Sequence, residues 1–179
     1  MSAEKLANRY ADALFSESTS TNKLEQSYAD LQVVADAIAE SREFSNYLKS
    51  PIIDSSKKLQ AFKEIFGSKV QATTMQFLDI IINNKRESYL PLILSKFFSK
   101  YNQTKGIAEV NVTVATELDA DTQKKIEDYI KKESGKANVK INQKIDASIL
   151  GGFIVDFGDK ILDNSVKQKL KKVKQQILN

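Results

Sequence analysis

The sequence contains no cysteine and no histidine in its 179 residues. Without cysteine, the chain can form no disulfide, no thiolate metal site and no cysteine nucleophile. Without histidine, it lacks the commonest general base and the commonest metal ligand, which excludes triad hydrolases and most zinc chemistry. The carboxylates, lysines, hydroxyls and tyrosines that remain form no evident catalytic cluster. We therefore expect no catalytic residue, no cofactor and no bound metal.

Long apolar segments are also missing. No run approaches the roughly 20 apolar residues that a membrane-spanning helix needs. The first residues, Met1 to Leu6, contain no apolar stretch after a basic segment, so they do not resemble a secretion signal. We expect a soluble chain that meets a membrane only indirectly.

Arginine is scarce. Of 27 basic residues only Arg9, Arg42 and Arg86 are arginine, and the net charge is a modest +4. Because reading of base edges and bidentate gripping of phosphate favour arginine, this composition argues against sequence-specific nucleic-acid binding. The hydrophobic content of 41% can fill the core of one large or two small domains.

Up to about Gly106, apolar residues recur at helical spacing. Asp54 is a suitable N-cap, Gly67 a suitable stop, and Pro91 fits the first turn of a helix that begins near Ser88. Short connections between the helices favour a compact six-helix bundle. The first predicted helix begins near Leu6 and ends around residues 16–21, and the others cover Leu24–Ile38, Arg42–Leu48, Asp54–Phe66, Val70–Asn83 and Ser88–Tyr101.

The predicted fifth helix is apolar on most of its circumference, from Phe77 to Ile82. It is either a central core helix or a helix that a partner half covers. Small residues of the first helix, Ala7, Ala11 and Ala13, would leave room beside it for a third helix.

Past Gly106 the pattern changes to α+β. Val110, Val112 and Val114 alternate with polar residues, which predicts a half-buried strand. Asp119 and Asp121 offer caps for a helix that Gly135 closes, and a second strand covers Val139–Ile145. The predicted fold is mainly α: a six-helix bundle over residues 1–105, followed by a smaller α+β domain over residues 106–179.

The closing segment combines several local signals. Phe153–Phe157 and Lys160–Asp163 should pair antiparallel through a type II′ turn at Gly158 and Asp159. Ser165 and Gln168 have the spacing of a capping box. The pair Gly151–Gly152 lacks the companions of a phosphate loop and indicates a bulge or a close backbone approach. Asp156, Asp159 and Asp163 lack calcium-loop spacing and suit turn and cap positions better than a metal site.

The last helix is rich in lysine and has an apolar stripe, and no acidic residue follows Asp163. The lysines form a solvated face, or they meet an acidic helix of a partner or an anionic lipid surface. The stripe has no large aromatic anchor, which argues against membrane insertion. Its residues are Val166, Leu170, Val173 and Ile177.

Three separated motifs resemble one family, the δ subunit of bacterial and chloroplast F-type ATP synthases, called the oligomycin-sensitivity-conferring protein in mitochondria. Ala7–Phe15 looks like the family's opening Ala-x-x-Tyr-Ala-x-Ala-Leu-Phe helix. Phe77–Leu90 resembles its fifth-helix segment, and Ile145–Val166 is similar to its closing signature. Asp156 departs from the pattern, because relatives often have a basic residue there. An acidic residue at this position would remove or reverse a charge contact with the stalk.

This resemblance implies a stator role without chemistry of its own. The protein would link the catalytic head to the b-subunit peripheral stalk, so that the head resists rotor torque during proton-driven ATP synthesis. A groove between the first and fifth helices would bind the N-terminal helix of an α subunit. The carried-over groove residues are Tyr10, Ala13, Leu14, Phe77, Leu78 and Ile81.

The C-terminal domain would bind the b-type stalk subunits. Its stalk-side structural motif comprises Gly151, Gly152, Gly158, Asp159, Asp163 and Ser165. The resemblance also implies a single copy per complex, at the cytoplasmic face of a bacterial inner membrane. The alternative is a lysine-rich helical protein that binds an anionic membrane or nucleic acid.

Overall fold

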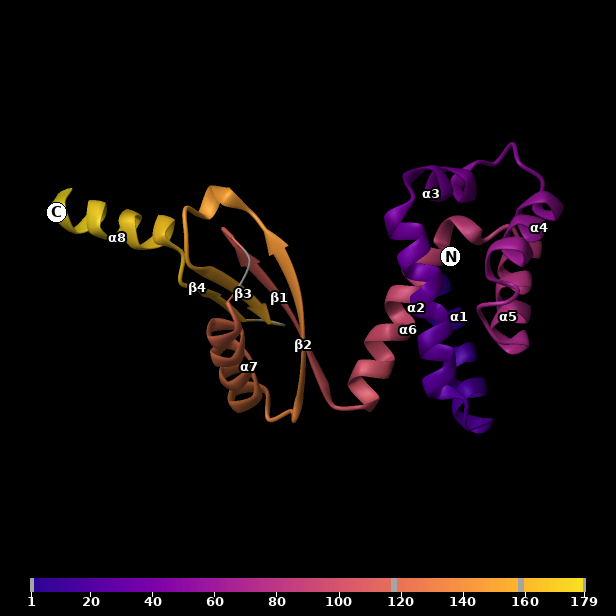
Figure 1. Cartoon of the computed structure of the whole chain (residues 1–179), viewed down its shortest axis with the longest axis horizontal. Helices are drawn as coiled ribbons and strands as arrows, with labels where there is room; N and C mark the ends of the chain where they lie inside the picture. Colours follow the sequence, from indigo (N-terminus) through magenta and orange to yellow (C-terminus); the bar gives the residue numbers. More distant parts are fainter. Residues whose placement is uncertain (1, 117–118, 158–159, 179) are drawn as a thin grey trace. The chain divides into compact units, whose positions relative to one another are not determined.

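A computed structural model describes residues 2–116, 119–157 and 160–178. The chain is mainly helical, with a four-stranded sheet in its C-terminal part (Figure 1). It divides into two compact units, Met1–Tyr101 and Asn102–Asn179, with the division inside the helix α6.

The N-terminal unit is built from helices joined by short connections. Ser2 caps the first helix by accepting a hydrogen bond from the backbone N–H of Lys5. Asp54 is the N-cap residue of α4 as predicted, although its side chain makes no cap hydrogen bond. Pro91 lies in the first turn of α6, where its missing N–H costs no helical hydrogen bond. The elements are α1 (Ala3–Ser20), α2 (Leu24–Glu40), α3 (Arg42–Lys49), α4 (Ser55–Phe66), α5 (Ala72–Asn83), the 3-10 helix η1 (Glu87–Tyr89) and α6 (Leu90–Thr104).

The broad apolar surface of α5 is explained mostly by the core of this unit. Phe77, Leu78, Ile81 and Ile82 are buried, and only Ile80 exposes half of its surface. On α1, Ala7 and Ala11 are buried as well, so they pack inside the unit and do not border a groove. Of the three small residues expected to border a groove, only Ala13 is exposed.

A tertiary contact caps α5. Its N-cap residue, Gln71, makes no cap hydrogen bond through its own side chain. Instead the buried carboxylate of Asp30 on α2 accepts from the Gln71 backbone N–H at 2.8 Å and from the Thr74 hydroxyl at 2.7 Å. The negative charge also suits the positive end of the helix dipole. The N-terminus of α5 is therefore fixed by a residue about 40 positions earlier.

The C-terminal unit is an α+β module whose sheet has the strand order β2-β1-β3-β4. β1 pairs parallel with β2 and antiparallel with β3, and β3 pairs antiparallel with β4. Helix α7 connects β1 to β2 and ends at Gly135, which has a left-handed φ of 66°. The elements are β1 (Ile107–Val114), α7 (Ala120–Ser134), β2 (Asn138–Ile145), the 3-10 helix η2 (Ala147–Ile149), β3 (Phe153–Phe157), β4 (Lys160–Asp163) and α8 (Val166–Leu178).

The core of this unit lies between α7 and one face of the sheet. The alternating residues of β1 that face the helix are completely buried, as the strand prediction required. Ile126 and Ile130 of α7 pack against them together with Val155 of β3. The predicted antiparallel pairing of Phe153–Phe157 with Lys160–Asp163 is confirmed. The turn predicted at Gly158 and Asp159 lies outside the described residues.

The close backbone approach predicted at Gly151–Gly152 is present in the structure. A Cβ atom at Gly152, which has a φ of 74°, would lie 2.4 Å from the carbonyl oxygen of Asn164. The backbone N–H of Asn164 in turn donates to the carbonyl of Phe153 at 3.0 Å. The start of β3 and the residues before α8 are therefore in direct backbone contact.

The capping box at the start of α8 is confirmed in one half and wrong in the other. The backbone N–H of Gln168 donates to the Ser165 hydroxyl at 3.1 Å, as predicted. The Ser165 N–H donates to the Asp163 carboxylate at 2.9 Å, so Asp163 holds the position expected for the Gln168 side chain. A carboxylate two residues earlier reaches this N–H through a local turn. Hydrogen bonding from Ser165 lowers the pKa of Asp163.

Candidate partner-binding surfaces

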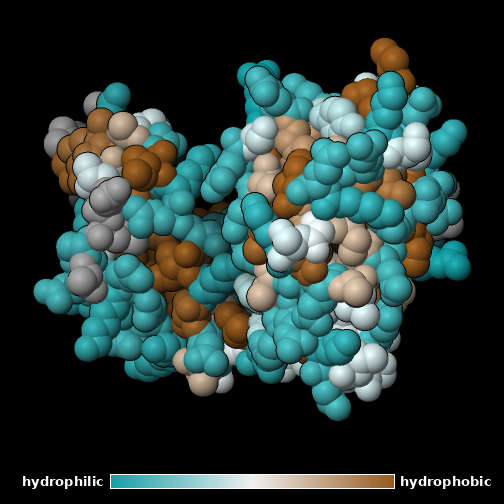
Figure 2. Space-filling model, turned by 45° about the vertical axis from the view of Figure 1, so that its right-hand side comes forward, coloured by the Kyte–Doolittle hydropathy of each residue, from teal (hydrophilic) through white to brown (hydrophobic). Residues whose placement is uncertain are grey.

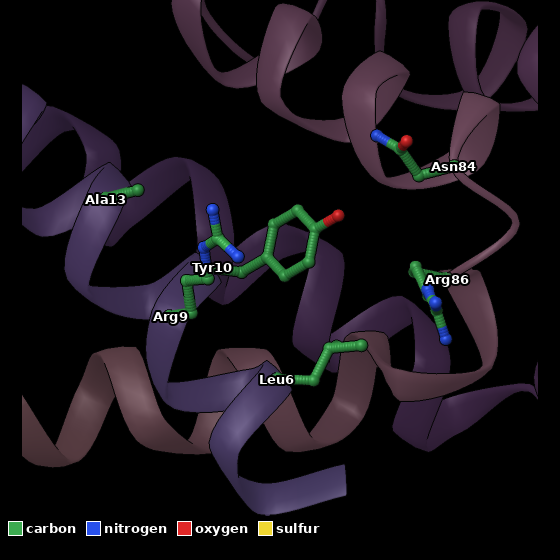
Figure 3. A pocket seen from close by; sticks show the side chains of 6 residues that line it. All are labelled: Leu6, Arg9, Tyr10, Ala13, Asn84 and Arg86. Carbon is green, nitrogen blue, oxygen red and sulfur yellow. The ribbon is translucent and has the colours of Figure 1, made fainter. Parts of the chain in front are cut away.

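A hollow of about 390 Å³ lies between the first half of α1 and the C-terminal end of α5. Figure 3 shows the Tyr10 ring extending from α1 across this hollow toward the segment that follows α5. It lies between the two helices where the family resemblance implied a groove. We call it the α1/α5 hollow, and its lining residues are Leu6, Arg9, Tyr10, Ala13, Asn84 and Arg86.

The structure separates the six predicted groove residues into two groups. Tyr10 and Ala13 line the hollow, and the Tyr10 ring packs edge-on against Phe77, with 6.5 Å between ring centroids. The other four have almost no exposed surface: Leu14 exposes 3%, Phe77 7%, Leu78 0% and Ile81 0%. They support the hollow from the core and offer no atoms to a partner while the unit keeps this packing.

The rim on the α5 side is formed by the turn that ends this helix. The Asn84 side-chain amide donates to the Ile80 carbonyl at 2.7 Å, and the Arg86 N–H donates to the Ile81 carbonyl at 2.9 Å. Lys85 between them has a left-handed φ of 57°. This turn closes the helix and leaves Arg86 at the hollow, opposite α1 (Figure 3).

A buried ion pair holds the residue next to this rim. Lys58 of α4 is 1% exposed, and its ammonium donates to Glu87 Oε1 at 2.5 Å. It also donates to the carbonyl oxygens of Leu48 at 3.0 Å and Ser50 at 2.7 Å. One lysine thus ties together the end of α3, the loop after it and η1. The rim residue Arg86 directly precedes Glu87, so the same contact positions the rim.

The α1/α5 hollow has an apolar base and a positive rim. Arg9 and Arg86 are both exposed, and neither forms an ion pair within the part of the chain that the structure describes. An apolar groove with cationic edges can bind an amphipathic helix that carries acidic residues. Sequence reasoning missed Leu6, Arg9, Asn84 and Arg86. A usable signal was present, since two of the chain's three arginines meet here.

In the C-terminal unit, α8 presents an exposed apolar stripe. Val166, Leu170 and Val173 expose 39%, 56% and 50% of their surface. Figure 2 shows hydrophobic side chains at the surface of both units, set among larger hydrophilic areas. The lysines of this helix whose exposure is described all face solvent: Lys167, Lys169, Lys171, Lys172 and Lys174.

The predicted stalk-side motif consists mostly of residues that shape the backbone. Gly152 allows the contact with Asn164, and Gly151, with a φ of 150°, accepts a hydrogen bond from the Val166 N–H at 2.9 Å. Ser165 is 2% exposed and Asp163 bonds to its N–H. Gly158 and Asp159, the other two members, lie outside the described residues.

The described parts of the chain contain neither a cluster of metal ligands nor a helix that could span a membrane. Within residues 2–116, 119–157 and 160–178, no group of three or more acidic side chains is placed to hold a metal ion. No helix in these ranges is long and apolar enough to cross a bilayer.

Comparison with known proteins gives a consistent result. Residues 6–177 match the family model described as ATP synthase delta (OSCP) subunit. The chain is 32% identical over 179 residues to ATP synthase subunit delta of Oceanobacillus iheyensis, covering 100% of this chain and 98% of that one. It is 28% identical to the chloroplastic subunit delta of Ochrosphaera neapolitana, covering 97% of each.

A solved structure shares the fold. A chain of the cryo-EM structure of the Toxoplasma gondii mitochondrial ATP synthase hexamer aligns with a TM-score of 0.76 at 24% identity. The alignment covers 97% of this chain and 98% of that chain.

Proposed function

Because the chain belongs to the ATP synthase delta (OSCP) subunit family, we propose that it is a non-catalytic stator subunit of an F-type ATP synthase. It links the catalytic head to the peripheral stalk, so that the head resists rotor torque during proton-driven ATP synthesis. One copy acts per complex, at the cytoplasmic face of a bacterial inner membrane. The family match carries this proposal, and the surfaces described above supply its residues.

The head-binding surface in this proposal is the α1/α5 hollow. The six helices of residues 1–105 act as one bundle, and the N-terminal helix of an α subunit lies across Tyr10 and Ala13. Its acidic residues pair with Arg9 and Arg86, which have no ion-pair partner among the described residues. The buried side chains of Leu14, Phe77, Leu78 and Ile81 keep the hollow preformed.

The stalk-binding surface is on residues 106–179 and engages the b-type stalk subunits. A stator link needs slow dissociation, and nanomolar binding corresponds to about 12 kcal/mol, which a helix in a preformed groove can reach. Attachment through two units raises the effective concentration of each contact, so that one can loosen while the other holds.

The test measures binding of the full chain to the catalytic head, with and without the first ~20 residues of the α subunit, a length that gives five to six helical turns. Ala13→Glu places a negative charge in the α1/α5 hollow and should weaken binding at least about tenfold, or about 1.4 kcal/mol. Asn8→Glu is the matched control, because Asn8 is exposed on α1 and does not line the hollow. Binding that is equally strong without the α-subunit segment, or in Ala13→Glu, would contradict the assignment of the α1/α5 hollow as the head-binding surface.

The alternative of a lysine-rich protein that binds an anionic membrane or nucleic acid has no support among these relatives, which are ATP synthase subunits. Its signature would be affinity for anionic vesicles or DNA alone that collapses with salt.

A further inference from the structure

Helix α7 covers only part of the apolar face of its sheet. It packs over β2 and β1, the two strands that it connects, and reaches Val155 in the middle of β3, which is buried. The same face continues over β3 and β4, where Phe153, Val155 and Phe157 alternate along β3 and Leu162 lies opposite Val155. No described element contacts this half of the face as extensively as α7 contacts β1 and β2.

Two adjoining hollows follow the border between α7 and this uncovered half. Their volumes are about 420 Å³ and 290 Å³, and both are lined by Tyr129, Val155 and Leu162. Tyr129 and Leu162 expose 42% and 39% of their surface. We call this surface the α7/β4 shelf: the buried side chains of Ile126 and Val155 form its floor, and its accessible part consists of Tyr129, Phe153, Phe157 and Leu162.

The dimensions of the shelf suit one helix. Neighbouring strands lie about 4.8 Å apart, so β3 and β4 together offer a strip about 10 Å wide. An α-helix with its side chains is also about 10 Å in diameter. One helix beside α7 would therefore complete the two-layer arrangement that buries a sheet face.

The charges at the edges of the shelf indicate which kind of helix would bind there. Lys125 of α7 lines one hollow, and Lys160 of β4 lines the other, where it pairs with Glu133 at 2.8 Å. Two lysines against one glutamate leave the edge positive. The chain's own α8 would bring more positive charge to it, since the described residues after Asp163 include lysines and no acid. A helix with acidic flanks is complementary to this edge.

We propose that the α7/β4 shelf, rather than α8, seats an amphipathic helix with acidic flanks from the b-type stalk subunits. This inference rests on the stator function proposed above and adds the seat and the chemistry of the partner. The apolar face of that helix covers Tyr129 and Leu162, and its acidic residues lie beside Lys125 and Lys160.

Two matched substitutions distinguish the shelf from α8. Leu162→Asp places a charge on the shelf, and Leu170→Asp places the same charge on the exposed stripe of α8. Binding of the full chain to the soluble part of the b-type stalk subunits is measured by calorimetry. We expect Leu162→Asp to weaken it at least about tenfold, as for a central apolar contact, and Leu170→Asp to change it less than about twofold.

A second shelf variant distinguishes loss of binding from loss of folding. Tyr129→Glu lies on a helix that tolerates glutamate and should weaken stalk binding like Leu162→Asp. Both variants should keep the wild-type circular dichroism and the wild-type affinity for the catalytic head. Lys125→Glu should weaken stalk binding and reduce its salt dependence.

The opposite pattern, with Leu170→Asp damaging and both shelf variants harmless, would overturn the proposal in favour of α8. So would a wild-type dimer in sedimentation that Leu162→Asp dissociates, since the occupant would then be a second copy. A disulfide that joins Leu162→Cys to Leu170→Cys in the isolated chain would make α8 the occupant and overturn it too. If wild-type protein fails to bind the stalk subunits at all, it is the stator proposal that fails.

Discussion

At the scale of single residues, the N-terminal unit depends on charges taken out of water and matched to specific partners. Lys58 is surrounded by three acceptors, and Asp30 accepts two hydrogen bonds at the start of α5. The contact of Lys58 with Glu87 joins residues 29 positions apart, and the two contacts of Asp30 span 41 and 44 positions. Because a buried charge without its partner is costly, these residues specify the arrangement of α3, α4, α5 and η1 more strongly than an apolar contact would.

Removal of the Lys58 ammonium should be far more damaging than removal of the whole ion pair. Lys58→Met leaves the Glu87 carboxylate buried without its cation and should lower the free energy of unfolding by about 3–5 kcal/mol. In Lys58→Met/Glu87→Leu no charge is stranded, and the loss should shrink to a small fraction of that value. Urea unfolding followed by helical circular dichroism measures both. Equal losses in the single and double variants would contradict this account.

The hydroxyl of Tyr101 should lose its proton only at an unusually high pH. Burial of its ring, followed by its hydrogen bond to Glu25, raises its pKa to about 12. The folded state keeps this proton longer than the unfolded state, whose tyrosine pKa is about 10. The stability from this group is therefore complete below pH 10 and is lost as the pH rises toward 12.

The tyrosinate absorbance measures this difference directly. Of the chain's six tyrosines, the component that titrates near pH 12 should disappear in Tyr101→Phe. Tyr28→Phe is the matched control, because it keeps the ring that stacks on Tyr101 and leaves the Tyr101 hydroxyl in place, so the late component should remain. An unchanged titration curve in Tyr101→Phe would show that another group is responsible.

At the scale of elements, backbone contacts fix how β3, β4 and α8 are arranged in the last part of the chain. β3, β4 and α8 meet where Gly151 and Gly152 pass close to Asn164 and Val166. The hairpin and the helix cap are thereby locked to one another. This contact sets the direction in which α8 leaves the sheet, and with it the surface beside the α7/β4 shelf.

Gly152→Ala should therefore be much more damaging than the same change at Gly135. Both residues have a left-handed φ, which costs alanine about 1 kcal/mol. At Gly135 a Cβ would meet nothing within 4 Å, whereas at Gly152 it would lie 2.4 Å from a backbone oxygen. We expect Gly135→Ala to lower the unfolding free energy of the C-terminal unit by about 1 kcal/mol and Gly152→Ala by more than about 2 kcal/mol. Similar losses for the two variants would mean that the backbone contact is not rigid.

At the scale of the whole molecule, the chain has two compact units, and each buries its own core. The first core is formed by helices, and the second by α7 against the sheet. The two attachment surfaces proposed above lie on separate units, as a linker that must hold two bodies at once requires.

The two cores should respond independently to mutation. Lys58→Met should destabilise the first unit and leave the unfolding of the second unchanged, and Gly152→Ala should do the reverse. In the double variant the two losses should add, because sites without shared partners add to within about 0.5 kcal/mol. Hydrogen exchange, read unit by unit, reports both losses in one sample. A loss of protection in both units from either single variant would show that the units unfold together.

The sequence by itself determined the elements and their order. The strand bounds Phe153–Phe157 and Lys160–Asp163 are those predicted, and the helix ends lie close to their expected positions. Such features follow from local physics: spacing of apolar residues, left-handed φ at glycine, and caps within a few positions. The family assignment rested on the same local motifs.

Only the tertiary structure decided which of the apolar residues stay at the surface. Leu14, Leu78 and Ile81 have the same apolar pattern as a groove surface, yet they lie in the core, while Arg9 and Arg86 reach the α1/α5 hollow from two separate elements. The burial of Lys58 and the uncovered half of the sheet depend equally on contacts between distant segments. Periodicity tells which side of a helix is apolar, but the packing of the other elements decides how much of that side remains for a partner.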